Sequence, residues 1–271
     1  MNSAMPIALT IAGSDSGAGA GIQADLKTFA AHEVYGTSVI TAVTAQNTLG
    51  VTAIEEVSVP LVEAQIDAIA EDLQPVAVKT GMLSSADIIR AVAARVRRHG
   101  LNRLVVDPVM VATSGDRLLH EDAVEALIHD LVPLALILTP NAAEAAVLAG
   151  MPVRNIGEAE AAAILIHDMG PEYVLITGGH FGAEAVDVLF DGRRFLTFSA
   201  PRVPTTSTHG TGCTFSSAIA AGLAHRLEME DAVSRAKEYT LEAIRRAFPA
   251  GAGHGPLNHF YRWWESTEEI R

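Results

Sequence analysis

Four consecutive residues near the end of the chain, Gly210, Thr211, Gly212 and Cys213, have the types and spacing of an anion-binding loop. They precede a run of small and apolar residues, SSAIAAGLA, which is typical of a buried helix. The first backbone N–H groups of a helix lack partners, the helix dipole favours negative charge there, and glycine allows close approach of a ligand. The segment therefore predicts a cradle for a phosphate or oxyanion. The alternative is a tight loop packed against a sheet.

Cys213 is the single cysteine of the chain and falls in the first turn of this predicted helix. Thiol pKa values fall at helix starts, so we expect a reactive thiol. The alternative is a small buried hydrophobic residue. A single cysteine excludes an intrachain disulfide and a cysteine-based zinc cluster, and it favours a reducing, cytoplasmic location.

Two acidic residues also lie where chemistry is expected. Asp107 precedes a proline at the end of a predicted strand, and Glu144 follows Asn141 by three residues at a predicted helix start. The Asn141–Glu144 spacing fits a capping box. Alternatively, Asp107 and Glu144 could hold Mg²⁺ through water, because that ion keeps much of its hydration. The residues alone leave both interpretations open.

A second glycine-rich stretch, at residues 17–21, resembles part of a dinucleotide-binding fingerprint. It lacks the last glycine of G-x-G-x-x-G, and no G-x-x-x-x-G-K-[ST] sequence occurs. A flexible strand-to-helix turn and a backbone that closely approaches a small ligand both remain open.

Short apolar runs alternate with segments of helical period along the chain. We predict strands at residues 7–12, 37–43, 76–79, 103–107, 134–138 and 173–177, an extended segment at 51–59, and a hairpin of 185–190 with 193–199. We predict helices around 22–29, 62–73, 88–99 (capped by Ser84 or Ser85 and ended by Gly100), 121–131, from Asn141 onward, 211–225 and 230–248. This order predicts an α/β fold with a doubly wound, mostly parallel sheet and helices on both faces, as a single domain over residues 1–271. Ligands bind at the carboxyl ends of the strands in such sheets, where the unusual polar and glycine residues cluster.

Composition excludes several classes. The 271 residues are 49% hydrophobic, which excludes wholesale disorder. The formal net charge of −13 argues against a nucleic-acid groove or an anionic membrane surface as partner. No apolar stretch approaches the roughly 18 residues of a transmembrane helix, and the first residues lack the basic start of a signal peptide.

A set of segments, ordered along nearly the whole chain, resembles the hydroxymethylpyrimidine/phosphomethylpyrimidine kinases of thiamine biosynthesis, in the ribokinase-like superfamily. They are AGSDSGAGAGIQADLKTF (12–29), TAVTAQNT (41–48), VKTGML (78–83), DPVMVATSGDRLL (107–119), TPNAAEA (139–145), HGTGCTFSSAIAAGLA (209–224) and GHGPLNHF (253–260). The resemblance implies phosphorylation of 4-amino-5-hydroxymethyl-2-methylpyrimidine by ATP with Mg²⁺, followed by a second phosphorylation to the diphosphate. It also implies a homodimer.

The resemblance assigns roles to individual residues. Gly13, Asp25, Gln46, Met82 and Val109 would line the pyrimidine pocket, Gly210, Thr211 and Gly212 would bind the migrating phosphoryl group, and Cys213 would be the base. Asp107 and Glu144 would hold the Mg²⁺–ATP shell, and Asn141, Thr177 and Lys237 would contact the nucleotide. A side-chain amide such as that of Gln46 carries one donor end and one acceptor end, which independently match an aminopyrimidine edge.

The sequence departs from the family pattern at Thr177, where many members have a lysine near the ATP phosphates. The loss of that cation leaves Lys237 as a possible replacement, although an ordinary solvated helix lysine is the alternative. A pyridoxal or pyridoxine kinase on the same fold, a dual activity and a non-catalytic pyrimidine-binding protein remain as other functions.

Overall fold

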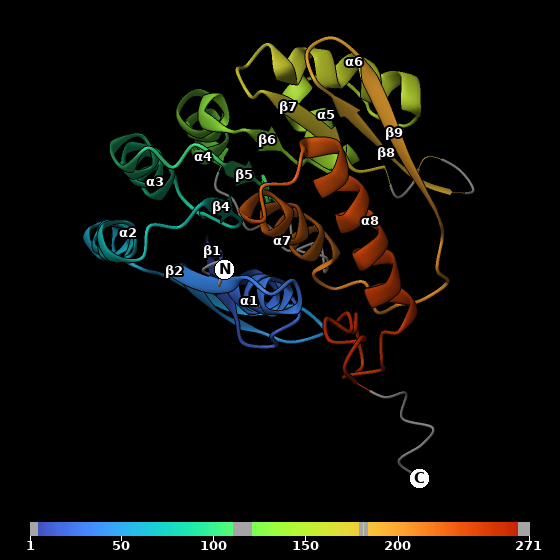
Figure 1. Cartoon of the computed structure of the whole chain (residues 1–271), viewed down its shortest axis with the longest axis horizontal. Coiled ribbons are helices and arrows are strands. Elements are labelled where there is room, and N and C mark those ends of the chain that lie inside the picture. Colours follow the sequence, from blue (N-terminus) through green and yellow to red (C-terminus); the bar gives the residue numbers. More distant parts are fainter. Residues whose placement is uncertain (1–4, 111–120, 179–180, 182–183, 265–271) are drawn as a thin grey trace.

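The computed structural model describes residues 5–110, 121–178, 181 and 184–264 (Figure 1). Residues 111–119 of the segment DPVMVATSGDRLL therefore lie outside the described residues. The strands are β1 (Ile7–Asp15), β2 (Tyr35–Gln46), β3 (Val51–Glu56), β4 (Ala77–Thr80), β5 (Leu104–Val106), β6 (Ile137–Leu138), β7 (Tyr173–Ile176), β8 (Glu184–Phe190) and β9 (Phe195–Pro201). The helices are α1 (Gly21–Ala31), α2 (Val59–Asp72), α3 (Ala86–His99), α4 (Glu121–Ala126), α5 (Ala142–Ala149), α6 (Ile156–His167), α7 (Thr211–Ala224) and α8 (Met229–Arg245).

The strands form one sheet in the order β3-β2-β1-β4-β5-β6-β7-β8-β9. The pairs from β2 through β1, β4, β5 and β6 to β7 are parallel, whereas β3, β8 and β9 pair antiparallel. The predicted α/β fold with a mostly parallel sheet and a hairpin near its end is thus confirmed. Parallel pairing also brings the carboxyl ends of these strands to one edge of the sheet. The polar and glycine residues that follow the strands in the sequence lie at this edge.

Helices cover both faces of this sheet (Figure 1). Alternate strand residues face opposite sides, so Leu104 and Val106 join the apolar core beneath α2–α6, while Val105 joins the core beneath α1, α7 and α8. The central strands are therefore buried on both sides, which explains their continuous apolar sequence. Among the described residues, no helix combines the length and apolar character needed to cross a bilayer.

Several predicted boundaries are wrong in ways that matter for the site. β1 continues past Ala12 to Asp15 through a bulge, because Asp15 pairs with Thr44 of a longer β2. Gln46 is consequently the last residue of β2 rather than part of the loop after it. These extensions place Asp15 and Gln46 in paired strands at the carboxyl edge of the sheet.

Other differences have local causes. The helix predicted at 121–131 is α4 followed by a π-helical turn, Leu127–Leu131, and the strand predicted at 134–138 shrinks to β6 behind a 3₁₀ turn, Val132–Leu134. The helix predicted from Asn141 ends at Gly150 in the left-handed conformation (φ +65°), and α6 starts separately. Ser85 occupies the cap position of α3, but its hydroxyl bonds Glu56 rather than the helix backbone.

Candidate active site

The start of α7 has the backbone geometry of an anion cradle. Gly210 caps the helix with φ +80°, and a Cβ there would lie 1.9 Å from the carbonyl oxygen of Gly19, so only glycine fits. Gly212 is exposed, with nothing within 4 Å of a Cβ added there. Within the described part of the chain, no acceptor pairs with the N–H groups of Gly212 and Cys213. These two donors are available to a bound oxyanion.

The expectation of an acidified thiol at Cys213 is wrong for the protein without ligands. Burial, together with the carboxylates of Asp107 and Asp25, raises the pKa of the thiol to about 12, although Lys79 and the Gly21 N–H group act in the opposite direction. The loss of hydration on burial, which disfavours the charged thiolate, therefore has a larger effect on the pKa of Cys213 than its position at the start of the helix. At neutral pH Cys213 is a protonated thiol.

A buried charge cluster lies beneath the anion cradle. Lys79 of β4 has no exposed surface, and its Nζ lies 3.0 Å from both carboxylate oxygens of Asp25 on α1. Thr10 and Ser217 each donate a 2.6 Å hydrogen bond to the same carboxylate. Asp25, assigned by resemblance to the pyrimidine pocket, is thus fully buried with both oxygens bonded to protein groups.

Lys79 links this cluster to Asp107. Its Nζ lies 3.9 Å from Oδ2 of Asp107, which also accepts a 3.1 Å hydrogen bond from Ser216. Burial alone would lower the pKa of Lys79, but the negative charges of Asp25 and Asp107 raise it above its usual value, as does Cys213 once its thiol ionises at high pH. A Cβ at Gly81 would lie 2.8 Å from Nζ, which explains a glycine at that position. Lys79 is therefore a permanent positive charge next to the anion cradle.

Glu144 and Asn141 form the capping box expected from their spacing. The Asn141 side chain accepts hydrogen bonds from the N–H groups of Ala143 and Glu144, and Glu144 accepts one from the Asn141 N–H group at 2.9 Å. Burial, with a contribution from the negative charge of Asp107, raises the pKa of Glu144 to about 8. The two carboxyl groups are thus close enough to destabilise each other's charge, which is the electrostatic setting in which a cation is favoured.

The remaining residues assigned to a pyrimidine pocket lie in three places. A Cβ added to Gly13 would meet the Met82 sulfur at 3.3 Å, so these two residues are neighbours across β1 and the end of β4. Val109 borders a small cavity together with Thr80, Gly81 and Asp107. Gln46, at the end of β2, is half-buried.

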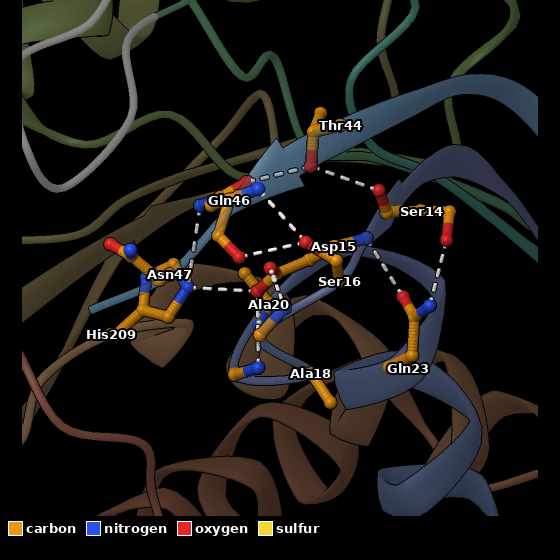
Figure 2. Close-up of polar contacts among 12 residues, drawn as sticks. Ser14, Asp15, Ser16, Ala18, Ala20, Gln23, Thr44, Gln46, Asn47 and His209 are labelled. Carbon is orange, nitrogen blue, oxygen red and sulfur yellow. Dashed lines mark hydrogen bonds and ion pairs between the residues drawn. The ribbon is translucent and has the colours of Figure 1, made fainter. Parts of the chain in front are cut away.

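Gln46 belongs to a polar network that joins three loops (Figure 2). The Asp15 carboxylate accepts hydrogen bonds from the backbone N–H groups of Gly17, Gly19 and Ala20 at 2.8–3.0 Å. The same carboxylate lies 2.9 Å from Nε2 of His209, the residue just before the anion cradle. The side-chain nitrogen of Gln46 lies 3.4 Å from that Nε2 atom. The network therefore ties the glycine-rich loop after β1 and the end of β2 to the start of α7.

Of the three residues assigned to the nucleotide, Asn141 and Thr177 follow β6 and β7, and Lys237 lies on α8. Asn141 and Thr177 form a parallel bridge, and Lys237 of α8 forms a 2.6 Å ion pair with Asp187. Asp187 also accepts a hydrogen bond from the Gly178 N–H group at 3.1 Å. Lys237 is thus held beside the residue that follows Thr177, unlike an ordinary solvated lysine.

Comparison with known proteins decides the family. The family model described as phosphomethylpyrimidine kinase matches residues 15–258. The chain belongs to the phosphomethylpyrimidine kinase family. A hydroxymethylpyrimidine/phosphomethylpyrimidine kinase of Rhizobium meliloti is 56% identical over 264 residues, which are 96% of this chain and 98% of the relative.

Solved structures extend the similarity to the fold. The ADP complex of a Bacillus subtilis pyridoxal kinase has a TM-score of 0.88 and 40% identity, and the match covers 94% of this chain and 98% of that one. A phosphomethylpyrimidine kinase from Clostridium difficile 630 has a TM-score of 0.80 and 46% identity, with coverage of 88% and 99%. These neighbours confirm the predicted ribokinase-like fold.

Three polar residues near the anion cradle of this phosphomethylpyrimidine kinase family member, Lys79, Asp15 and His209, were not predicted from the sequence. Lys79 is the only charged residue within β4, and a charge inside a strand of this kind is itself a signal. Asp15 and His209 lay within quoted segments, but nothing local indicated that they pair across 194 residues.

The raised pKa of Cys213 leads to a test with an alkylating reagent. Because only the thiolate reacts, we expect the rate of iodoacetamide labelling to rise about tenfold per pH unit from pH 6 to pH 9, without a plateau. Mass spectrometry would measure the fraction of labelled protein. Because the chain has a single cysteine, each cysteine adduct reports Cys213. Glutathione is the control, since its rate levels off near its ordinary thiol pKa. A plateau of the Cys213 rate below pH 8 would contradict the assignment.

Proposed function

We propose that this chain is an ATP-dependent kinase that phosphorylates 4-amino-5-hydroxymethyl-2-methylpyrimidine and then its monophosphate, in thiamine biosynthesis. The observation that carries the proposal is the 56% identity to the Rhizobium meliloti relative, which is named for both kinase activities. The match covers 98% of that relative's length. The geometry supports it, because a helix start with free N–H groups lies beside Asp107 and near a half-buried carboxamide, Gln46.

The pyrimidine would lie between the ends of β1, β2 and β4. Gly13 leaves space beside Met82, whose side chain would cover one face of the ring, and Val109 would contact it from the neighbouring cavity. Gln46 would read the ring edge through its donor and acceptor ends. Asp25 would support this pocket from beneath, through Lys79.

Phosphoryl transfer depends on positioning and on neutralising charge. The substrate alcohol oxygen would form a bond to the terminal phosphorus of ATP as the bond to the ADP oxygen breaks. The alcohol proton would pass to the thiolate form of Cys213, so the thiol must first lose its own proton to solvent when the site is loaded. Gly210, Thr211 and Gly212 would hold the migrating phosphoryl group, with the N–H groups of Gly212 and Cys213 as donors. Lys79 stabilises the thiolate that this proton transfer requires.

Asp107 and Glu144 would hold Mg²⁺, and Asn141, Thr177 and Lys237 would contact the nucleotide. The two carboxyl groups fit such an ion, because both are buried and each disfavours the other's negative charge in its absence. One or two carboxylates completed by water and phosphate oxygens is the usual magnesium environment. When bound, the ion would neutralise charge on the phosphates.

Three further properties belong to this proposal. The continuous sheet supports a single domain over residues 1–271. A homodimer and a cytoplasmic location follow from the resemblance and from the single cysteine.

A pyridoxal or pyridoxine kinase, or a dual activity, is the second candidate. Its support is the TM-score of 0.88 to a pyridoxal kinase at 40% identity. Both substrates present a hydroxymethyl group on a heteroaromatic ring, so the same cradle would serve either.

Product analysis distinguishes these functions. The purified protein is incubated with ATP and Mg²⁺ and, separately, with the hydroxymethylpyrimidine, pyridoxine or no acceptor, and the products are separated by mass. We expect pyrimidine monophosphate followed by diphosphate. Pyridoxine phosphate as the dominant product would instead assign a vitamin B6 kinase, and tight pyrimidine binding without any product would indicate a binding protein.

A further inference from the structure

His209 lies at the junction of the two halves of the proposed site. It precedes Gly210 of the anion cradle, and its imidazole reaches the end of β2, where Gln46 would read the pyrimidine. The imidazole is buried, with its Nε2 atom 2.9 Å from Asp15 Oδ2 and 3.4 Å from the side-chain nitrogen of Gln46 (Figure 2). The position of its proton therefore affects both halves of the site.

The surroundings of Asp15 determine where that proton is. Backbone N–H groups of Gly17, Gly19 and Ala20 all donate to the Asp15 carboxylate. Burial alone would raise the pKa of Asp15, but the bonds from His209, Ala20 and Gly17 hold it below its usual value. An ionised carboxylate only accepts hydrogen bonds, so Nε2 of His209 must carry a hydrogen and donate it to Asp15.

A protonated Nε2 constrains the Gln46 amide. With the amide nitrogen 3.4 Å from Nε2, two donors face each other. The hydroxyl of Thr44 would then have to serve two acceptors with one hydrogen, the Gln46 Oε1 atom at 3.1 Å and the Ser14 carbonyl at 3.0 Å. Turning the amide over replaces the donor–donor contact with a shared hydrogen bond, in which the Nε2 hydrogen points mainly to Asp15 at 2.9 Å and also toward the amide oxygen at 3.4 Å. The amide nitrogen then donates to the Thr44 hydroxyl, which keeps its own hydrogen for the Ser14 carbonyl. The two ends of an amide have nearly the same shape, so these hydrogen bonds decide between them.

We propose that His209 is a positioning residue that holds the Gln46 amide with its oxygen toward the anion cradle and its nitrogen toward Thr44. This inference rests on the proposed pyrimidine substrate. In the substrate ring, the hydroxymethyl group is next to the 4-amino group, and ring nitrogen N3 is on the other side of that amino group. If the Gln46 oxygen accepts from the 4-amino group and the Gln46 nitrogen donates to N3, the hydroxymethyl group points toward His209 and the cradle.

The reverse amide orientation would point the hydroxymethyl group away from the cradle. His209 thus fixes the direction of the ring, and with it the group that is phosphorylated. It also makes the site selective, because a 4-oxo ring carries the inverted pattern of an acceptor at position 4 and a hydrogen on N3. Such a ring can match the fixed amide only in the unproductive direction.

The test compares two acceptors, the 4-amino substrate and its 4-oxo analogue, through the ratio of their kcat/KM values. His209→Leu removes the donor, whereas His209→Gln places an amide N–H group where Nε2 was. We expect His209→Leu to reduce the preference for the 4-amino substrate by about tenfold, and His209→Gln to retain it within about threefold. His259→Leu is the matched control, since His259 is also buried and bonds Thr214 of α7. Its ratio should equal that of the wild type.

The outcomes separate this inference from the proposed function. A wild-type protein that phosphorylates neither ring would overturn the proposed function and this inference with it. A wild-type protein that phosphorylates the 4-amino substrate, with an unchanged ratio in His209→Leu, would overturn the inference alone.

A second measurement needs no variant. Long-range ¹H–¹⁵N correlation spectra of the full chain report which imidazole nitrogen of His209 carries hydrogen. We expect the hydrogen on Nε2. An unprotonated Nε2 would accept from the Gln46 nitrogen, reverse the amide and refute the proposal.

Discussion

Replacement of Cys213 by alanine is expected to slow phosphorylation of the hydroxymethylpyrimidine by about 10²-fold or more, and phosphorylation of its monophosphate far less. The first acceptor is an alcohol, whose proton must leave during transfer. The second acceptor is a phosphate oxygen, which is already ionised near neutral pH and needs no base. Separate assays with the alcohol and the monophosphate as sole acceptors would measure the two effects.

The high pKa of the Cys213 thiol makes this comparison decisive. At a pKa of about 12 the thiol is almost entirely protonated at neutral pH in the protein without ligands, so a role as base requires the loaded site to favour the thiolate. Equal losses in both steps would show that Cys213 only positions the acceptor. Cys213→Ser is the size-matched control, because it keeps a hydrogen-bonding group but not an acidic one.

Replacement of Lys79 by methionine is expected to lower the free energy of unfolding by about 3–5 kcal/mol, because it leaves the Asp25 carboxylate buried without its cation. The pKa of Lys79 is raised in the folded protein, so its stabilising contribution is complete below about pH 10 and is lost only at higher pH. Urea unfolding should therefore give the same loss at pH 6 and pH 8.

Two controls separate the buried charge from general damage. The double variant Lys79→Met/Asp25→Asn should recover part of the loss, since it removes the unpaired charge as well. Arg154→Met breaks an ion pair with Glu158 on the surface and should leave the unfolding midpoint close to that of the wild type. A loss in Lys79→Met that the double variant does not reduce would contradict the electrostatic explanation.

Local pattern was enough to predict most of the fold. The short apolar runs of the central strands, the cap residues around α3 and the Asp191-Gly192 turn of the β8–β9 hairpin are properties of neighbouring residues. The boundaries that were wrong depend on distant partners. β1 extends to Asp15 only because β2 lies beside it, which no local pattern shows.

The same distinction holds for the site. The glycines around Cys213 and the capping box of Glu144 were visible as short motifs. Lys79 was not recognised, because its partner Asp25 lies 54 residues away and burial, not spacing, makes the pair important. The pKa of Cys213 was predicted in the wrong direction for the same reason, since desolvation depends on what packs around the thiol.

The segment at residues 253–258 has a consequence for how the protein folds. Gly253 and His254 donate backbone hydrogen bonds to Thr48 in the turn after β2, and the Gly255 carbonyl accepts one from His209. The Gly253–Thr48 contact closes a loop of 205 residues. Contacts of such long range form late, because the entropy of loop closure must be overcome first. During synthesis on the ribosome, the sheet can therefore begin to form early, but the end of the proposed site around His209 stays incomplete until residue 255 has emerged.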